Sequence, residues 1–367
     1  MNIQPLVVVV FFVGGLVAHV IELSAAPTFT VTIDDPGDQY PSYHAGLMSH
    51  ALAAASLWGS RIDSDADLSL VVHIDPAFTL GGGRSLTTGF VGNQVYSGNG
   101  NNYDVFNQGL AHEIITGNDP NGEDYDAEIS LGPDYLVNNL WFDPDPNART
   151  AEVPNDCTDA MSVFLHELAH AFAFNGWRGA YDGQITTGYL STYDMLIERD
   201  SGTGDLSFTG SRAEDYYGGR VPVTTQGPNT YHHLGNNAPK PGSELIPDLM
   251  NGVVFTFGTR YYISGLDLAV LADVGIPIIP TPLAGDVNID GVVNIFDINL
   301  VSAHWNETGP TGDANGDRIV NIFDVNLISS HWTPTGGTAT AVSEPSALVL
   351  NLMGLVGLIA FGWRRRR

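Results

Sequence analysis

The chain has 367 residues, a length that predicts one domain of roughly 200 residues or more together with smaller appended parts. Its formal net charge is −27, from 14 Lys and Arg against 41 Asp and Glu, and this scarcity of cations argues against a nucleic-acid partner, because phosphate binding needs clustered positive charge. The single cysteine, Cys157, excludes an intramolecular disulfide.

Residues 1–26 begin the chain with an apolar run that is followed by small residues. This pattern predicts a secretory signal peptide, which would carry the chain out of the cytoplasm. An uncleaved membrane anchor is the alternative, since the stretch lacks the usual Lys or Arg near its start.

Residues 27–276 mix strand patterns, helical patterns and loops rich in Gly and Asn. We expect strands at 28–33 and 68–74, a helix at 45–62 and a long loop at 91–109. This mixture predicts an α+β fold for the largest domain.

A metal-binding motif, HELAH, occupies residues 166–170 within a run, 161–174, that is otherwise apolar on nearly every face. Such a run predicts a buried helix that accepts polar groups at one place only. His166 and His170 share one helix face and can both bind Zn²⁺, while Glu167 flanks the metal as a general base. Metal-assisted hydrolysis needs this arrangement.

A catalytic zinc usually takes three protein ligands, so a third must come from farther along the chain. The compact metzincin spacing fails, because Ala173 and Gly176 stand where its glycine and third histidine would be. Glu198 would complete a thermolysin-like set, whereas His232 and His233 offer a histidine. Neighbouring side chains on an extended segment point in opposite directions, so we expect at most one of these two histidines to bind. We favour His233, but the alternation by itself leaves His232 open.

The order of HELAH, a distant histidine, Met250 and a capped helix at 264–275 resembles the leishmanolysin-like branch of the metzincin peptidases. In that branch an insertion separates the second and third histidines, and the resemblance implies that Met250 forms the turn beneath the metal. It also implies that a zinc-bound water hydrolyses peptide bonds of a protein or peptide substrate. The strand expected at 127–132 would then be the edge strand that pairs with substrate.

These features predict a zinc-dependent metalloendopeptidase that is secreted or held at the cell surface. The alternative is a non-catalytic surface protein that keeps the zinc fold as a scaffold and works through a C-terminal binding module. Glu167 favours the enzyme, because a scaffold has no need of a general base. No cysteine-switch motif surrounds Cys157, which we expect to be a buried thiol or part of the cap region of the motif helix.

A Pro-rich linker at 277–284 leads to an internal repeat at 285–333, where GDVNIDGVVNIFDINLVSAHW returns 27 residues later as GDANGDRIVNIFDVNLISSHW. Each copy places oxygen-bearing side chains at loop positions one, three and five and an acid at position twelve, a spacing that binds Ca²⁺. The predicted ligands are Asp286, Asn288, Asp290 and Asp297 in the first copy, and Asp313, Asn315, Asp317 and Asp324 in the second. The pair resembles a type I dockerin, which implies a small domain of two Ca²⁺-binding loop-helix units and a cohesin-like partner.

A second linker, 334–342, precedes a C-terminal segment, 343–367, that contains an E-P-S triplet, an apolar span at 347–363 and four terminal arginines. The span is just long enough for a transmembrane helix with the arginines on the cytoplasmic side. The segment resembles a PEP-CTERM sorting tail, which implies membrane attachment and processing by an exosortase-type enzyme. A plain C-terminal anchor is the alternative, and both would leave the rest of the chain outside the cytoplasm.

Overall fold

The computed structural model describes residues 25–147, 149, 151–226, 230–279, 285, 287, 293–306, 314 and 319–332. The chain divides into two compact units, Met1–Thr281 and Pro282–Arg367, and the division falls inside the segment predicted as the first linker. The predicted signal peptide up to residue 24, the second linker and the sorting tail lie outside the described residues. Within the described ranges, no helix is long and apolar enough to cross a membrane.

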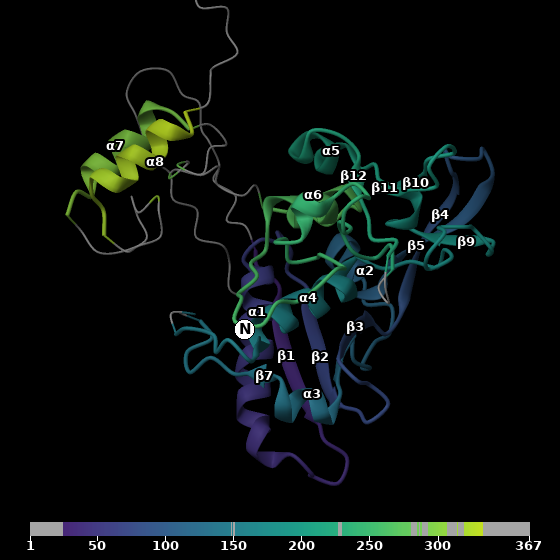
Figure 1. The fold of residues 1–367 in the computed structure, drawn as a ribbon, viewed down its shortest axis with the longest axis horizontal. Coiled ribbons are helices and arrows are strands. Elements are labelled where there is room, and N and C mark those ends of the chain that lie inside the picture. The colour runs from purple at the N-terminus through teal and green to yellow at the C-terminus, as the bar shows by residue number, and fades with distance from the viewer. Residues whose placement is uncertain are drawn as a thin grey trace, which may run out of the picture. The chain divides into compact units, whose positions relative to one another are not determined.

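A mixed four-stranded sheet forms the centre of the first unit, in the order β1-β2-β6-β3. Figure 1 labels three of its strands, β1, β2 and β3. β1 (Thr28–Asp34), β2 (Asp67–Ile74) and β6 (Ala127–Leu131) run parallel, and β3 (Gly81–Ser85) pairs antiparallel with β6. β1 and β2 confirm the two strands predicted at the start of this region. Together with the helices described below, they make the first unit a mixed α and β fold, which agrees with the predicted α+β class.

The edge of this sheet differs from the prediction. β6 coincides with the strand expected at 127–132, yet it lies between β2 and β3, so its assignment as the edge strand was wrong. The edge belongs to β3, whose sequence GGGRS shows no hydrophobic alternation and has low β-propensity. Pairing with β6 defines this strand, and no local sequence pattern indicates it.

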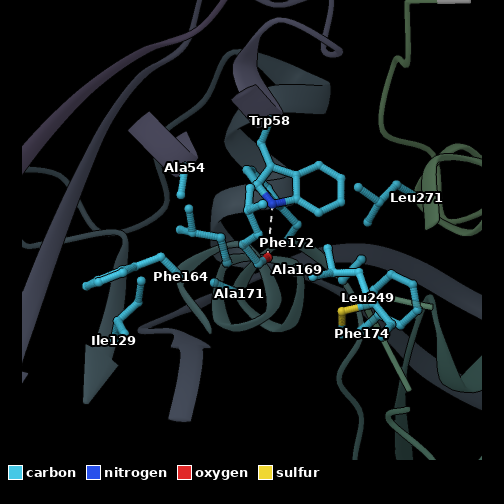
Figure 2. Packing of buried hydrophobic residues seen from close by; sticks show 14 of the residues in the cluster. Ala54, Trp58, Ile129, Phe164, Ala169, Ala171, Phe172, Phe174, Leu249 and Leu271 are labelled. Carbon is cyan, nitrogen blue, oxygen red and sulfur yellow. Dashed lines mark hydrogen bonds between the residues drawn. The ribbon is translucent and has the colours of Figure 1, made fainter. Parts of the chain in front are cut away.

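Two helices pack against each other and against the sheet, α1 (His44–Gly59) on β1 and α4 (Ala160–Phe172) on β3 and β6. α1 confirms the helix predicted in this region. Trp58, near the end of α1, is fully buried, and its indole N–H donates to the backbone carbonyl of Leu165 in α4 at 3.0 Å (Figure 2). The Trp58 ring also meets Phe172 edge-on, so aromatic packing and a hydrogen bond hold α4 against α1.

Smaller elements of the described chain surround this core: two three-stranded sheets, β4-β5-β9 and β10-β11-β12, a two-stranded sheet, β7-β8, and four further α-helices. Their bounds are β4 (Thr88–Val95), β5 (Asn102–Gln108), α2 (Gly109–Thr116), α3 (Pro133–Asn138), β7 (Leu140–Trp141), β8 (Thr158–Asp159), β9 (Tyr189–Ser191), β10 (Ile197–Arg199), β11 (Leu206–Phe208), α5 (Ser211–Tyr217), β12 (Val221–Pro222) and α6 (Gly265–Asp273). α6 confirms the capped helix expected at 264–275, with a capping box between Ser264 and Asp267.

The long loop predicted at 91–109 is instead largely an antiparallel hairpin of β4 and β5. Its Gly and Asn residues hide the alternation on which a strand prediction depends. The pairing includes Phe90 opposite Phe106, whose rings meet edge-on with centroids 5.3 Å apart. Such a cross-strand aromatic pair stabilises a hairpin that the local sequence does not indicate.

The first residues of the predicted linker belong to the first unit. Ile278 forms a β-bridge with Ile62, and the backbone N–H of Ile279 donates to the carbonyl of Arg61 at 2.8 Å. Residues 277–279 therefore continue the packed chain of the first unit, and the linker at 277–284 stays a prediction.

The second unit contains two helices, α7 (Ile295–Ala303) and α8 (Ile322–Ser330), at equivalent places in the two repeat copies. The helices pack together around a small core of Val293, Val301, Val320 and Ile328, all fully buried. Among the described residues, this unit therefore has far fewer buried apolar side chains than the first.

Candidate metal centre

Helix α4 carries the HELAH motif and is buried along its whole length. It begins at Asp159, whose carboxylate accepts the backbone N–H of Ser162 at 3.1 Å as an N-cap. It ends at Phe172, two residues before the end of the predicted run. Beyond the end of the helix, the carbonyl of Phe174 accepts a hydrogen bond from Nδ1 of His170 at 2.7 Å. This contact orients the His170 ring.

Three histidine rings converge at one end of the cleft beside α4. Nε2 of His170 lies 3.1 Å from Nε2 of His166 and 3.1 Å from Nε2 of His233. His166 and His170 come from consecutive turns of α4, whereas His233 comes from a loop 63 residues after His170. The structure therefore forms a three-histidine cluster that could hold a metal ion.

The second nitrogen of each ring faces a backbone carbonyl. Nδ1 of His166 lies 2.8 Å from the Leu249 carbonyl, and Nδ1 of His233 lies 3.3 Å from that of Thr230. A carbonyl can only accept, so these contacts and the one from His170 to Phe174 assign the proton to Nδ1 in all three rings. The three Nε2 atoms then present lone pairs to one another, which is unfavourable without a cation between them.

The pKa values of the three clustered histidines indicate that their rings are neutral. Burial lowers the pKa of His166 to about 3, with His170 adding to the shift, and burial lowers the pKa of His170 to about 4. Burial, followed by the neighbouring histidines, also holds the pKa of His233 well below its usual range. All three imidazoles are therefore neutral at neutral pH, which is the form that binds a metal.

The spacing fits a small divalent ion. Imidazole nitrogens bound tetrahedrally at about 2.05 Å would lie about 3.3 Å apart, close to the two observed Nε2 separations of 3.1 Å. Backbone acceptors behind each ring are the usual supports of histidine ligands. The donor set therefore suits a metal that prefers imidazole, such as zinc.

Glu167 extends into the same cleft from the next position of α4. Burial raises its pKa to about 8, and a hydrogen bond from the backbone of Gly83 opposes this shift. The carboxyl group therefore sits in an environment that favours accepting and keeping a proton, unless a nearby cation lowers its pKa.

Glycines in β3 allow the sheet edge to approach α4 this closely. A Cβ on Gly83 would lie 2.1 Å from the backbone carbonyl oxygen of Glu167, and a Cβ on Gly81 would lie 3.0 Å from Oε1 of Glu167. No rotamer change relieves the first contact, because it is made with backbone. Sequence reasoning missed this strand, although three consecutive glycines are a signal for close backbone approach.

The sequence also did not indicate the buried network that positions the third histidine. The hydroxyl of Tyr231, two residues before His233, donates to Oδ1 of Asp194 at 2.7 Å, and the hydroxyl of Tyr193 donates to the Tyr231 carbonyl at 2.9 Å. The Asp194 carboxylate also accepts the backbone N–H groups of Ser191 and Trp177. These groups are far apart in sequence, so only the folded chain connects them to His233.

Met250 is fully buried, in a segment whose backbone contacts both His166 and the residue that follows His233. Its neighbour Leu249 supplies the carbonyl behind His166, and the Met250 carbonyl accepts the backbone N–H of Leu234 at 2.7 Å. Leu234 directly follows His233, so this segment lies against both ligand-bearing elements. The role of Met250 as a turn beneath a metal stays a prediction.

The other predicted ligands do not join the cluster. Nε2 of His232 accepts the backbone N–H of Gly176 at 3.2 Å, so this ring is engaged elsewhere. Glu198 lies on β10 and forms an ion pair with Arg220 at 2.7 Å, which rules out the thermolysin-like set in this structure. Cys157 is half-buried and lies two residues before the N-cap of α4. Of the two places predicted for this thiol, the structure therefore agrees with the cap region, and Cys157 is not part of the cluster.

The histidine cluster opens into a cleft of about 340 Å³ between α4, β3 and the loops that carry His233 and Asn251. Apolar side chains line it beside the polar ligands, a composition typical of sites that bind organic ligands. The lining residues other than the three histidines and Glu167 are Leu80, Gly81, Gly82, Gly83, Tyr135, Val163, Asn175, His232, Asn251, Val254 and Phe255.

In the second unit, the structure describes two of the eight predicted calcium ligands, and both are fully buried. Asp297 accepts the backbone N–H groups of Val287 and Asn294, each at 2.8 Å. Asp324 accepts those of Ala314 and Asn321 at 2.8 and 2.7 Å, in the same register. The other predicted ligands, Asp286, Asn288, Asp290, Asp313, Asn315 and Asp317, lie outside the described residues.

Comparisons of the chain with models of known protein families, with curated proteins and with solved structures found no match. The interpretation of the site therefore rests on its geometry and chemistry.

Proposed function

We propose that the chain is an exported, zinc-dependent endopeptidase. The observation that carries this proposal is the convergence of three Nε2 atoms, from the buried His166 and His170 and the half-buried His233, beside the Glu167 carboxylate in an open cleft. His166, His170 and His233 would hold the metal through Nε2, with one position left for water or substrate. When bound, zinc would supply a Lewis acid that acidifies water and polarises a carbonyl group.

The chain's own groups supply the remaining steps. Glu167 would take a proton from the attacking water on its carboxylate and pass it to the leaving amine, which is general base and then general acid catalysis. The Glu167 pKa of about 8 suits a group that must hold this proton between the two steps. A nearby divalent cation would lower this pKa toward 7. The backbone carbonyls behind the histidines would keep the ligands in their metal-binding orientation.

An extended peptide is the substrate that this cleft favours. β3 has β6 as its neighbour on one side within the described sheet, which leaves its other edge as a partner for a peptide strand. Because β3 carries glycines beside Glu167, main-chain hydrogen bonds would bring the scissile bond close to the carboxylate without obstruction by side chains. Val254 and Phe255 in the cleft would contact apolar substrate side chains.

The decisive experiment measures bound zinc and peptide hydrolysis for the parent, Glu167→Ala, His233→Ala and His232→Ala. We expect Glu167→Ala to keep zinc and lose about 100- to 10,000-fold in kcat/KM, the usual contribution of general acid-base catalysis. We expect His233→Ala to lose zinc and His232→Ala to keep it. If the parent binds zinc but hydrolyses no peptide, the non-catalytic scaffold is favoured. If the parent binds no zinc, both the peptidase and the zinc-scaffold hypotheses are refuted.

We propose in addition that the second unit binds two Ca²⁺ ions. Asp297 and Asp324, at loop position twelve, accept backbone N–H groups in matching registers, which supports two equivalent loops. Such a module is suited to attach the peptidase unit to a cohesin-like partner at the cell surface.

A further inference from the structure

A second group of possible metal ligands lies on the first unit, apart from the histidine cluster. Glu113 on α2, Asp119 in the following loop and Asp126 directly before β6 each bring one carboxylate oxygen within 4.8 Å of the others. Two oxygens bound to one Ca²⁺ at about 2.3–2.6 Å can lie at most about 5 Å apart, so this spacing allows a shared ion.

Two of these carboxylates are buried, and one has an unpartnered oxygen. Glu113 is 7% exposed and Asp126 is 3% exposed. Oδ2 of Asp126 accepts the backbone N–H and the hydroxyl of Ser69 at 2.7 and 2.9 Å. No N–H or hydroxyl group donates to the buried Oε2 of Glu113. Burial, followed by the neighbouring Asp126 carboxyl, raises the pKa of Glu113 to about 7. An ionised carboxylate in this position is strongly unfavourable unless a proton or a cation compensates it.

No protein cation supplies that compensation. Among the described residues, no Lys, Arg or His forms an ion pair with Glu113, Asp119 or Asp126. The loop also holds a second unsatisfied oxygen, Oδ1 of Asn121, which is buried without a partner. Oδ1 of Asp119 accepts the backbone N–H of Asn121 at 2.8 Å, which keeps these two residues together.

We propose that Glu113, Asp119 and Asp126 bind Ca²⁺, with the Asn121 carboxamide oxygen as a further ligand. All the donors are oxygens, which favours a hard cation over zinc, and an irregular set of carboxylates and an amide suits Ca²⁺ better than the strict octahedron of Mg²⁺. The ion would tie α2 and its loop to β2 and β6, because Asp126 also holds Ser69 of β2. Its role would be structural, since it would brace the sheet whose edge lines the metal centre.

The test is local hydrogen exchange in the full chain, because the repeats of the second unit would also take up Ca²⁺. Residues 109–126 are followed with and without 10 mM Ca²⁺, in the parent, Glu113→Gln and Asp119→Asn. Glu123→Gln is the matched control, because Glu123 is an exposed acid of the same loop outside the cluster. Asp119 is exposed, so its substitution leaves the core intact even if that of Glu113 does not.

We expect Ca²⁺ to slow exchange in this segment about 10- to 100-fold in the parent and the control, the factor for a Kd of about 0.1–1 mM. Glu113→Gln and Asp119→Asn should lose this protection and bind one Ca²⁺ fewer per chain. Unchanged exchange in the parent would overturn the proposal and indicate a shared proton between Glu113 and Asp126. Protection by Mg²⁺ but not by Ca²⁺ would overturn the choice of ion.

Discussion

The histidine cluster of the first unit and the buried aspartates of the second are both candidate ligands for cations, yet the two regions are built in opposite ways. The cluster uses neutral nitrogens held by backbone carbonyls, in a cleft beside a large apolar core. Asp297 and Asp324 are acidic groups with no exposed surface, next to a core of four aliphatic side chains. Packing can therefore arrange the first set without a metal, whereas we propose that the second set, held by four backbone N–H groups, depends on a bound ion for its stability.

The largest expected difference between the two units is in their protection from hydrogen exchange after metal ions are removed. With excess chelator at neutral pH, we expect the amides of α7 and α8 to lose nearly all protection from hydrogen exchange, because their small core cannot offset the buried carboxylates. The amides of α4 should keep most of theirs, because the helix is held by α1 and the sheet. Exchange measured by mass spectrometry on the full chain checks both, and equal loss in α4 and α8 would contradict this contrast.

A methyl group on β3 tests how far packing alone sets the histidine cluster. Gly83→Ala should lower the free energy of unfolding of the first unit by about 1–3 kcal/mol, because its Cβ would collide with the backbone carbonyl of Glu167. Gly82→Ala is the matched control, since its Cβ meets the side chain of Phe78, which can move. Chemical denaturation of the zinc-loaded chain measures both, and equal costs would show that the close approach of β3 is not limiting.

The smallest expected effect concerns His50, a buried histidine of α1 outside the metal cluster. Its Nδ1 donates to the Gly46 carbonyl at 2.9 Å, and its Nε2 accepts the backbone N–H of Asp143 at 2.9 Å, so both nitrogens are satisfied in the neutral ring. Burial lowers its pKa below the usual 6.5. The pKa of His50 is lower in the folded than in the unfolded protein, so the neutral ring stabilises the fold fully above pH 6.5. This stabilisation is lost as the pH falls, by up to about 1.4 kcal/mol of unfolding free energy per pH unit.

His50→Gln removes this titration, so its free energy of unfolding should fall less than that of the parent between pH 7 and 5.5. Subtracting the two profiles cancels the contribution of the other histidines, which both proteins share. Urea unfolding at fixed zinc and calcium concentrations provides the values, and parallel profiles would refute the neutral state assigned to His50.

Much of the first unit was predictable wherever a segment carries its own pattern. β1, β2, α1 and α6 have clear apolar periodicity or a capping residue, and the structure confirms them. β3 and the β4-β5 hairpin were missed, because glycine and asparagine carry no such pattern. β3 is formed by pairing with the distant β6, and the hairpin by pairing of two consecutive strands.

The sequence by itself determined that His166, Glu167 and His170 occupy a buried helix with the two histidines on one face, because residues four apart lie above one another on consecutive helical turns. It also left Glu198, His232 and His233 as competing third ligands, since no local rule orients a side chain 63 residues away. The tertiary structure places His233 in the cluster through the hydrogen bond between Tyr231 and Asp194 and the backbone acceptor of the His233 ring. Such contacts depend on which distant segments the whole core brings together, and that information is not contained in any one stretch of the chain.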